Sequence, residues 1–255
     1  MDDKASKRKG LLWALAALAL GALLAGGVGP LAHAIPRSWE KRLGRALSLD
    51  LQGKACRPSP SEQALLQRLV ERIYPLDDAE RAEPIEVRVV REAAVNAYAG
   101  LGGQITVNSG LLSKAGSPEE LAGVLAHEIE HVRHRHVMEG AIVHLFSWQG
   151  LQLIFGGSAS AGLAQALLRM DFTKVQEAEA DKAGLQRLQK AEVDTKGLAR
   201  FFERMKKEQG GASFLSDHPD DDSRIAMAEA YPTAHPRMIM TTAEWLVLRS
   251  FGCGE

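Results

Sequence analysis

The residues with the clearest capacity for chemistry are two histidines and a glutamate in HEIEH, residues 127–131. A helix advances about 100° per residue, so side chains four apart lie nearly above one another. His127 and His131 can therefore present two imidazole nitrogens to one metal ion, and Glu128 is placed to hydrogen-bond a water held by that ion. Two neutral imidazoles, one carboxylate and one water suit a catalytic zinc site. The pattern predicts zinc-dependent hydrolysis, in which the ion acidifies the water and Glu128 passes its proton to the leaving amine.

A third protein ligand must come from elsewhere in the chain. Metzincins supply a histidine six residues after the second one, but Val137 stands there, which excludes that pattern. Downstream, QEAEAD places Glu177 and Asp181 four apart on one face of an expected helix. Glu177 is the candidate third ligand, and Asp181 is the candidate partner of the second ring nitrogen of a ligating histidine. Glu179 points about 200° away from Glu177 and is the poorer ligand.

The helix that carries HEIEH has a clear predicted start. Ser117 is a candidate N-cap, Pro118 occupies the first helical position, and a glutamate stands at the third. Apolar spacing predicts that this helix continues until about Gly140. His134 and His136 lie in this stretch, and we expect them to be solvated or packing side chains because three protein ligands already suffice.

Other segments complete the predicted framework. Residues 61–74 have helical spacing, with Ser61 as the candidate N-cap. IEVRVV (85–90) and QITVN (104–108) are predicted strands, separated by the glycine-rich AYAGLGG. Residues 141–168 contain no Asp, Glu, Lys or Arg, but polar residues and a glycine turn interrupt them. They predict two short buried or membrane-apposed helices rather than a membrane span.

The first 34 residues differ in composition from the rest of the chain. Four cations precede an uncharged run at residues 11–29, and a small-residue A-x-A site follows at residues 32–34. This arrangement predicts a secretory signal peptide. The run also nearly crosses a hydrocarbon core of about 30 Å, so an uncleaved anchor in the inner membrane is the alternative. Either way, the domain at residues 35–255 is expected to be exported to the periplasm or another extracytoplasmic space.

Composition narrows the classes of function further. The chain has 255 residues, and Lys plus Arg (31) nearly balance Asp plus Glu (32). Basic residues cluster only at the extreme N-terminus, so nucleic-acid binding has little support. In an oxidising compartment Cys56 and Cys253 are predicted to form one disulfide, the alternative being two separate thiols.

The ordered set of motifs resembles a known family. HEIEH with VRHRH following, GGQITVNSGLL before it, QEAEAD after it and DHPDDDSRI further on are similar to peptidase family M48. That family includes HtpX-type, Oma-type and CAAX-prenyl-protease-type zinc metalloproteases, and the resemblance covers roughly residues 60–250. It implies an α+β, mainly helical zincin-like fold of the gluzincin type, with a small sheet whose edge strand borders the active-site cleft. It also implies one zinc per chain held by His127, His131 and Glu177, with Glu128 as the catalytic base.

Further assignments rest on that similarity alone. The family has an Asn-Ala-aromatic-Ala stretch followed by an edge strand that lines the cleft, and residues 96–99 and 103–107 match it. The resemblance implies that a peptide substrate pairs as an added strand with Asn96, Ala97, Tyr98, Gln104, Ile105, Thr106 and Val107. His218 is expected to stabilise the oxyanion or occupy the open zinc position, and Arg224 to brace the site. Lys174 departs from the more usual arginine, which affects a supporting contact and not the metal.

Three functions fit these residues to different degrees. The leading hypothesis is an exported zinc endopeptidase, either released from the membrane or anchored in it, that hydrolyses peptide bonds in unfolded or misassembled envelope proteins. This substrate class comes from the resemblance. The second is a zinc-containing chaperone or assembly factor that binds client strands along residues 104–108 and rarely cuts. A structural zinc protein is disfavoured, because closed structural sites use four protein ligands, often cysteines, and the cysteines here are far from the motif.

Overall fold

The computed structural model describes residues 27–47, 55–146, 171–207, 221–251 and 253. Most of the predicted leader lies outside these residues, as do His218 and most of the uncharged run at residues 141–168. Within the described ranges, none of the helices combines the length and the apolar character that a bilayer crossing requires.

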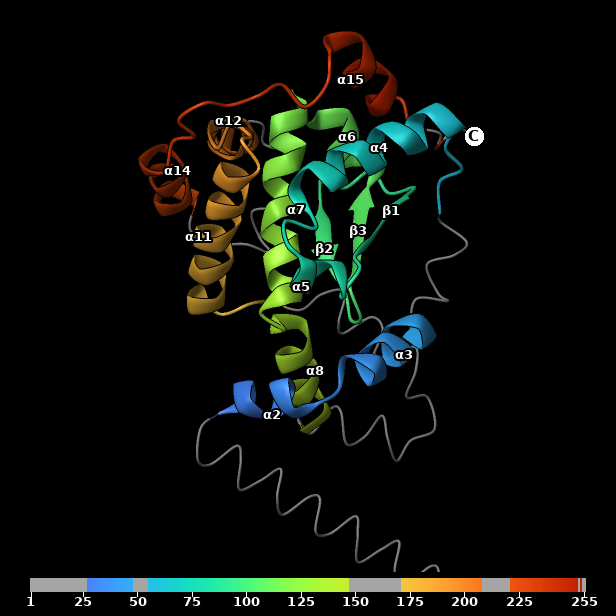
Figure 1. Cartoon of the computed structure of the whole chain (residues 1–255), viewed down its shortest axis with the longest axis vertical. Coiled ribbons are helices and arrows are strands. Elements are labelled where there is room, and N and C mark those ends of the chain that lie inside the picture. The colour runs from blue at the N-terminus through green and yellow to red at the C-terminus, as the bar shows by residue number, and fades with distance from the viewer. Residues whose placement is uncertain (1–26, 48–54, 147–170, 208–220, 252, 254–255) are drawn as a thin grey trace, which may run out of the picture.

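The described chain consists of helices around one small sheet, which confirms the mainly helical α+β class (Figure 1). The strands are β1 (Glu86–Val90), β2 (Ala97–Ala99) and β3 (Gln104–Asn108). The helices are α2 (Val28–Ala34), α3 (Arg37–Leu47), α4 (Pro60–Ile73), α5 (Asp78–Arg81), α6 (Ser109–Lys114), α7 (Pro118–Arg133), α8 (His136–Phe146), α11 (Lys174–Lys190), α12 (Lys196–Lys207), α14 (Asp221–Ala230) and α15 (Thr242–Arg249).

The sheet has the order β1-β3-β2, so β3 is its central strand. β3 pairs in parallel with β1 and antiparallel with β2. The prediction that residues 103–107 form the exposed edge is therefore wrong. The edge strand beside β3 is β2, which lies in the segment that was predicted to be a glycine-rich connection. Gly102 and Gly103 explain the difference, because their φ values of 77° and 89° make the tight turn that folds β2 back on β3.

Helix α7 lies between the sheet and the pair α11 and α12 (Figure 1). The predicted start is confirmed, since the Ser117 side chain accepts from the backbone of Glu120 and Pro118 is the first helical residue. α11 approaches α7 closely at Gly184, where an added Cβ would lie 3.2 Å from the backbone nitrogen of His127. A larger residue at this crossing would push α11 away from the helix that carries HEIEH.

Helix α7 ends at Arg133, before the predicted continuation to about Gly140. The chain turns at Arg135, whose φ of 63° is left-handed and unfavourable for a residue with a Cβ. Long-range contacts hold this turn, because the buried Arg135 guanidinium donates to Glu40 Oε2 at 2.8 Å and to the His33 carbonyl at 3.2 Å. α8 then begins at His136, and the helical periodicity of the sequence did not reveal the break.

The N-terminal cap of α4 lies two residues earlier than predicted. Ser59, not Ser61, is the N-cap, and it forms a capping box with Glu62. Pro60 then occupies the first helical position, where its fixed φ suits a helix and its missing N–H is not needed. Ser61 is already helical and cannot serve as the cap.

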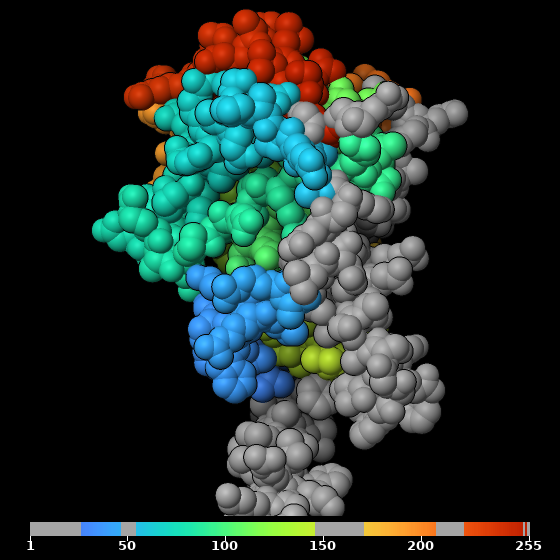
Figure 2. Space-filling model, turned by 90° about the vertical axis from the view of Figure 1, so that its right-hand side faces the viewer, coloured from blue at the N-terminus to red at the C-terminus, as the bar shows by residue number. Residues whose placement is uncertain are grey.

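Two segments far apart in the sequence are joined covalently. A disulfide links Cys56 and Cys253, as predicted. An ion pair of 2.8 Å between Arg68 on α4 and Glu244 on α15 lies across the same region. In the side view of Figure 2, α15 (red) and the N-terminal helices α2 and α3 (blue) lie at opposite ends of the described molecule, with α4 (cyan) between them.

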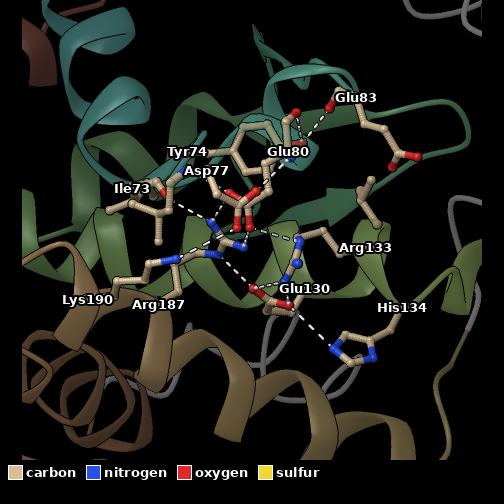
Figure 3. A network of polar contacts seen from close by, with 12 residues as sticks. Ile73, Tyr74, Asp77, Glu80, Glu83, Glu130, Arg133, His134, Arg187 and Lys190 are labelled. Atoms are coloured by element: carbon tan, nitrogen blue, oxygen red, sulfur yellow. Dashed lines mark hydrogen bonds and ion pairs between the residues drawn. The ribbon is translucent and has the colours of Figure 1, made fainter.

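A buried ionic network joins α11 to α7 through Glu130, the second glutamate of HEIEH (Figure 3). Arg187 on α11 donates to Glu130 on α7 at 2.6 Å, to Glu80 on α5 at 2.6 Å and to the Ile73 carbonyl at 2.8 Å. Burial opposes ionisation of Glu130, but the hydrogen bond from His134 and the nearby arginine charges lower the pKa of Glu130 to about 2. Arg187, Glu130 and Glu80 are all buried, so separating α11 from α7 would leave charges poorly paired in the interior. These contacts therefore help to fix the spacing of the two helices.

We expect Arg187→Met to lower the free energy of unfolding by about 3–5 kcal/mol, because it removes the buried cation between Glu80 and Glu130 and leaves them only the partly exposed Arg133 as an arginine partner. Urea unfolding of the zinc-free protein, followed by circular dichroism, measures this loss without a contribution from bound metal. The matched control is Arg200→Met, which removes a half-exposed ion pair with Asp194 and should cost less than about 1 kcal/mol. Equal, small losses in both variants would contradict a stabilising role for this network.

Candidate metal centre

The fold brings together three predicted ligands from two helices. His127 and His131 lie on α7, with their Nε2 atoms 3.0 Å apart, and Glu177 enters from the first turn of α11. The carboxylate oxygens of Glu177 lie 3.5 Å from His127 Nε2 and 3.4 Å from His131 Nε2. All three residues are at most 3% exposed. Three donor atoms thus converge in the interior, within 4.8 Å of one another.

These residues fit a tetrahedral zinc ion. Donors bound at about 2.0–2.2 Å in a tetrahedron lie about 3.3–3.6 Å from one another, close to the separations seen here. The net charge of the buried groups also favours a cation. When the imidazoles are neutral, the formal charge is −2, from three carboxylates and one guanidinium (Glu128, Glu177, Asp181 and Arg224). Such a charge is expensive to bury, and a divalent cation balances it.

Asp181 and Arg224 support the His127 side of the centre. Asp181 Oδ1 lies 2.9 Å from His127 Nδ1, the nitrogen that faces away from the other ligands. Arg224 on α14 donates two hydrogen bonds of 2.6 Å to the same carboxylate. Its Nη1 lies 3.4 Å from Glu177 Oε2. Its guanidinium stacks 4.3 Å from the ring centre of Phe202. The arginine is thus held by α11 and α12 as well as by its own helix.

Glu128 connects α7 to the edge of the sheet. Its Oε2 accepts a hydrogen bond of 2.7 Å from the backbone nitrogen of Ala99 on β2, and Glu128 is fully buried. Asn96 and Gly100 use their backbone groups to pair with β3, so the alternate residues Ala97 and Ala99 direct theirs away from β3. The candidate base therefore lies at the outer edge of β2. The sequence contained no signal for this backbone contact.

The His131 side of the centre has a different environment. The ring of His131 stacks on Phe172, with centroids 3.9 Å apart, and meets His136 edge to face. His136 Nδ1 lies 3.0 Å from His131 Nδ1. Burial and the neighbouring His134 lower the pKa of His136. His136 thus packs, as expected, but the residue that it packs against is the candidate ligand His131. Helical periodicity did not indicate this contact.

The remaining predicted site residues separate into two groups. Asn96, Ala97 and Tyr98 lie on or beside the edge strand. By contrast, β3 is paired on both sides, and three of its four predicted contact residues are buried in the core, so it cannot accept an added strand. The prediction is therefore wrong for Gln104, Ile105, Thr106 and Val107 as a pairing edge. Lys174 is exposed at the first residue of α11, and His218 lies outside the described residues.

The sequence matches one family over most of its described length. The model described as "Peptidase family M48" matches residues 60–231, from the first residue of α4 to just beyond α14. The chain belongs to peptidase family M48. In this M48 chain the matched region contains the HEIEH motif, the QEAEAD motif and Arg224, and thus every described group of the candidate metal centre.

Several curated M48 relatives are similar to the chain. Metalloprotease LoiP of Escherichia coli K12 is 30% identical over 220 residues, which are 80% of this chain and 84% of LoiP. Mitochondrial metalloendopeptidase OMA1 of Arabidopsis thaliana is 36% identical over 145 residues, 54% of this chain and 30% of OMA1. The beta-barrel assembly-enhancing protease of E. coli K12 is 28% identical over 182 residues, 63% and 37% of the two chains. The chain thus spans about a third of the length of the latter two relatives.

Proposed function

We propose that the chain is a zinc-dependent endopeptidase that cleaves unfolded or misassembled proteins of the cell envelope. The observation that carries this proposal is the convergence of His127, His131 and Glu177 in the interior, with the Glu128 carboxylate one step along the same helix. Family membership supports it, because the relatives named above are metalloproteases. The chaperone alternative shares the metal centre but gives Glu128 no chemical task.

The roles of the residues follow from their positions. The chemistry that zinc supplies when bound is acidification of water to a pKa of about 7 and polarisation of the scissile carbonyl. Glu128 would take a proton from the attacking water and return it to the leaving amine. Asp181 accepts the Nδ1–H of His127 and so directs Nε2 of this ring toward the other ligands. Arg224 holds Asp181 in the orientation that this contact requires.

Substrate is recognised through its backbone at the outer edge of β2. Ala97 and Ala99 direct their backbone groups away from β3. Their N–H groups already donate to Asn96 Oδ1 and Glu128 Oε2, so an added strand pairs with the outward carbonyls or displaces these contacts. Because the Ala99 N–H already contacts Glu128, a strand added here brings its own backbone next to the base. Backbone pairing is weakly selective for side chains, which suits a protease that acts on unfolded chains.

The envelope location rests on three separate observations. The Cys56–Cys253 disulfide is of the kind that persists in oxidising compartments outside the cytoplasm. The cationic, then apolar, N-terminus has the pattern of an export signal or anchor. One relative is named for its effect on the assembly of β-barrels. Together they favour extracytoplasmic protein substrates.

Metal analysis of the purified full-length chain tests the proposal directly. We expect about one zinc ion per chain, casein cleavage that stops on treatment with 1,10-phenanthroline, and recovery on adding zinc. Full zinc occupancy with binding but no cleavage of unfolded casein would favour the chaperone. Cleavage that persists in metal-free protein would refute the zinc mechanism altogether.

A further inference from the structure

His136 contacts a candidate zinc ligand from outside the metal centre. It is the first residue of α8, is 2% exposed, and its Nδ1 lies 3.0 Å from His131 Nδ1. Its other ring nitrogen, Nε2, lies 3.5 Å from Glu179 Oε2 on α11. The left-handed turn at Arg135, held by Glu40, gives His136 this position immediately after α7 ends.

The direction of these hydrogen bonds follows from the role of His131 in the proposed function. His131 Nε2 faces His127 and Glu177, so a neutral His131 that binds metal through Nε2 carries its proton on Nδ1. This N–H needs an acceptor, and His136 Nδ1 is at hydrogen-bond distance. A neutral His136 that accepts at Nδ1 carries its own proton on Nε2, which points toward Glu179.

We propose that His136 is a positioning residue for the ligand His131, and that Glu179 in turn fixes the tautomer of His136. This inference rests on the zinc site of the proposed function. The two ligand histidines then have different supports: His127 donates directly to the carboxylate of Asp181, whereas His131 donates to an imidazole that a carboxylate holds. Both arrangements orient the ring and raise the basicity of its ligating nitrogen.

The same residues have another geometric interpretation. His134, His136 and Glu179 have donor atoms within 4.8 Å of one another, as a second metal site would. A metal on His136 Nε2 would move the proton of this ring to Nδ1, where it would face the N–H of His131 only 3.0 Å away. The hydrogen bond to His131 therefore disfavours a metal at this position, and Glu179 is the acceptor instead.

The test compares zinc affinities of the full-length protein, measured by competition with a chromogenic chelator. His136→Leu removes the acceptor and should weaken zinc binding by about 10–100-fold, the effect usual for such partners. In His136→Asn the side-chain oxygen takes the place of Nδ1, so the affinity should return to within about 3-fold of the original. His235→Leu, the same substitution at an exposed histidine outside the metal centre, is the matched control and should leave zinc affinity unchanged.

Each outcome decides the proposal. Unchanged zinc affinity in His136→Leu, or equal losses in the Leu and Asn variants with unchanged thermal unfolding of the zinc-free proteins, would refute the positioning role. A second equivalent of zinc that binds the original chain and is lost in Glu179→Gln would show that His136 is a ligand instead. If the original chain binds no zinc, the proposed function fails along with the inference. If it binds zinc without cleaving casein, only the protease function fails.

Discussion

Replacing Glu128 with glutamine is expected to lower the rate of casein cleavage by about 10²–10⁴-fold, the usual contribution of a general base. The amide cannot take a proton, but it has nearly the same shape and keeps an oxygen that can accept the Ala99 N–H. Zinc content and the affinity for unfolded casein should therefore remain close to those of the original chain. Rates from a fluorescent casein assay, together with metal analysis of the same sample, measure both quantities.

Glu119→Gln is the matched control for this variant, because it makes the same substitution in the first turn of the same helix. Its cleavage rate should equal that of the original chain. Undiminished cleavage by the Glu128 variant would remove this residue from its role as base. If neither the original chain nor the variant cleaves casein, while both bind zinc and unfolded casein, the chaperone function would replace the protease.

Replacing Glu177 with glutamine should weaken zinc binding by more than about 100-fold, because removal of an outer partner of a ligand already costs about 10–100-fold. The carboxylate lies within 3.5 Å of both ligand histidines, and its charge offsets that of the metal. Casein cleavage should fall in parallel at limiting zinc and recover in part when zinc is added in excess. Chelator competition and a zinc titration of activity measure the two effects.

Glu203→Gln on α12 is the control here, since it removes a carboxylate from an exposed position. It should leave zinc affinity within the error of the measurement. A Glu177 variant that keeps a full complement of tightly held zinc would show that the third ligand is misassigned. Together with the Glu128 variant, this experiment separates loss of the base from loss of the metal.

Local sequence signals predicted the parts of the molecule that depend on neighbours along the chain. The two HEIEH histidines share a helix face because of the pitch of the helix, and the cap at Ser117 marks where that helix begins. QEAEAD likewise predicted that Glu177 and Asp181 lie on one face of a second helix, which α11 contains. The disulfide between Cys56 and Cys253 was predicted from the compartment and the cysteine count.

Contacts between distant segments decided the rest. The sequence predicted two strands, but the order β1-β3-β2 depends on a tight turn at Gly102 and Gly103 and on pairing along both sides of β3. Periodicity alone extended α7 past Arg133, whereas a buried contact with Glu40 stabilises a turn that an isolated chain would avoid.

The metal centre, too, depends partly on local sequence and partly on contacts between distant segments. Residue types and spacing determined which side chains can bind zinc, because those properties are local to each helix. Only the tertiary structure decided that the β2 backbone contacts Glu128, that His136 adjoins His131, and that Arg187 ties α11 to α7. Such contacts join residues from separate elements, and their geometry depends on packing across the whole core, which no short stretch of sequence specifies.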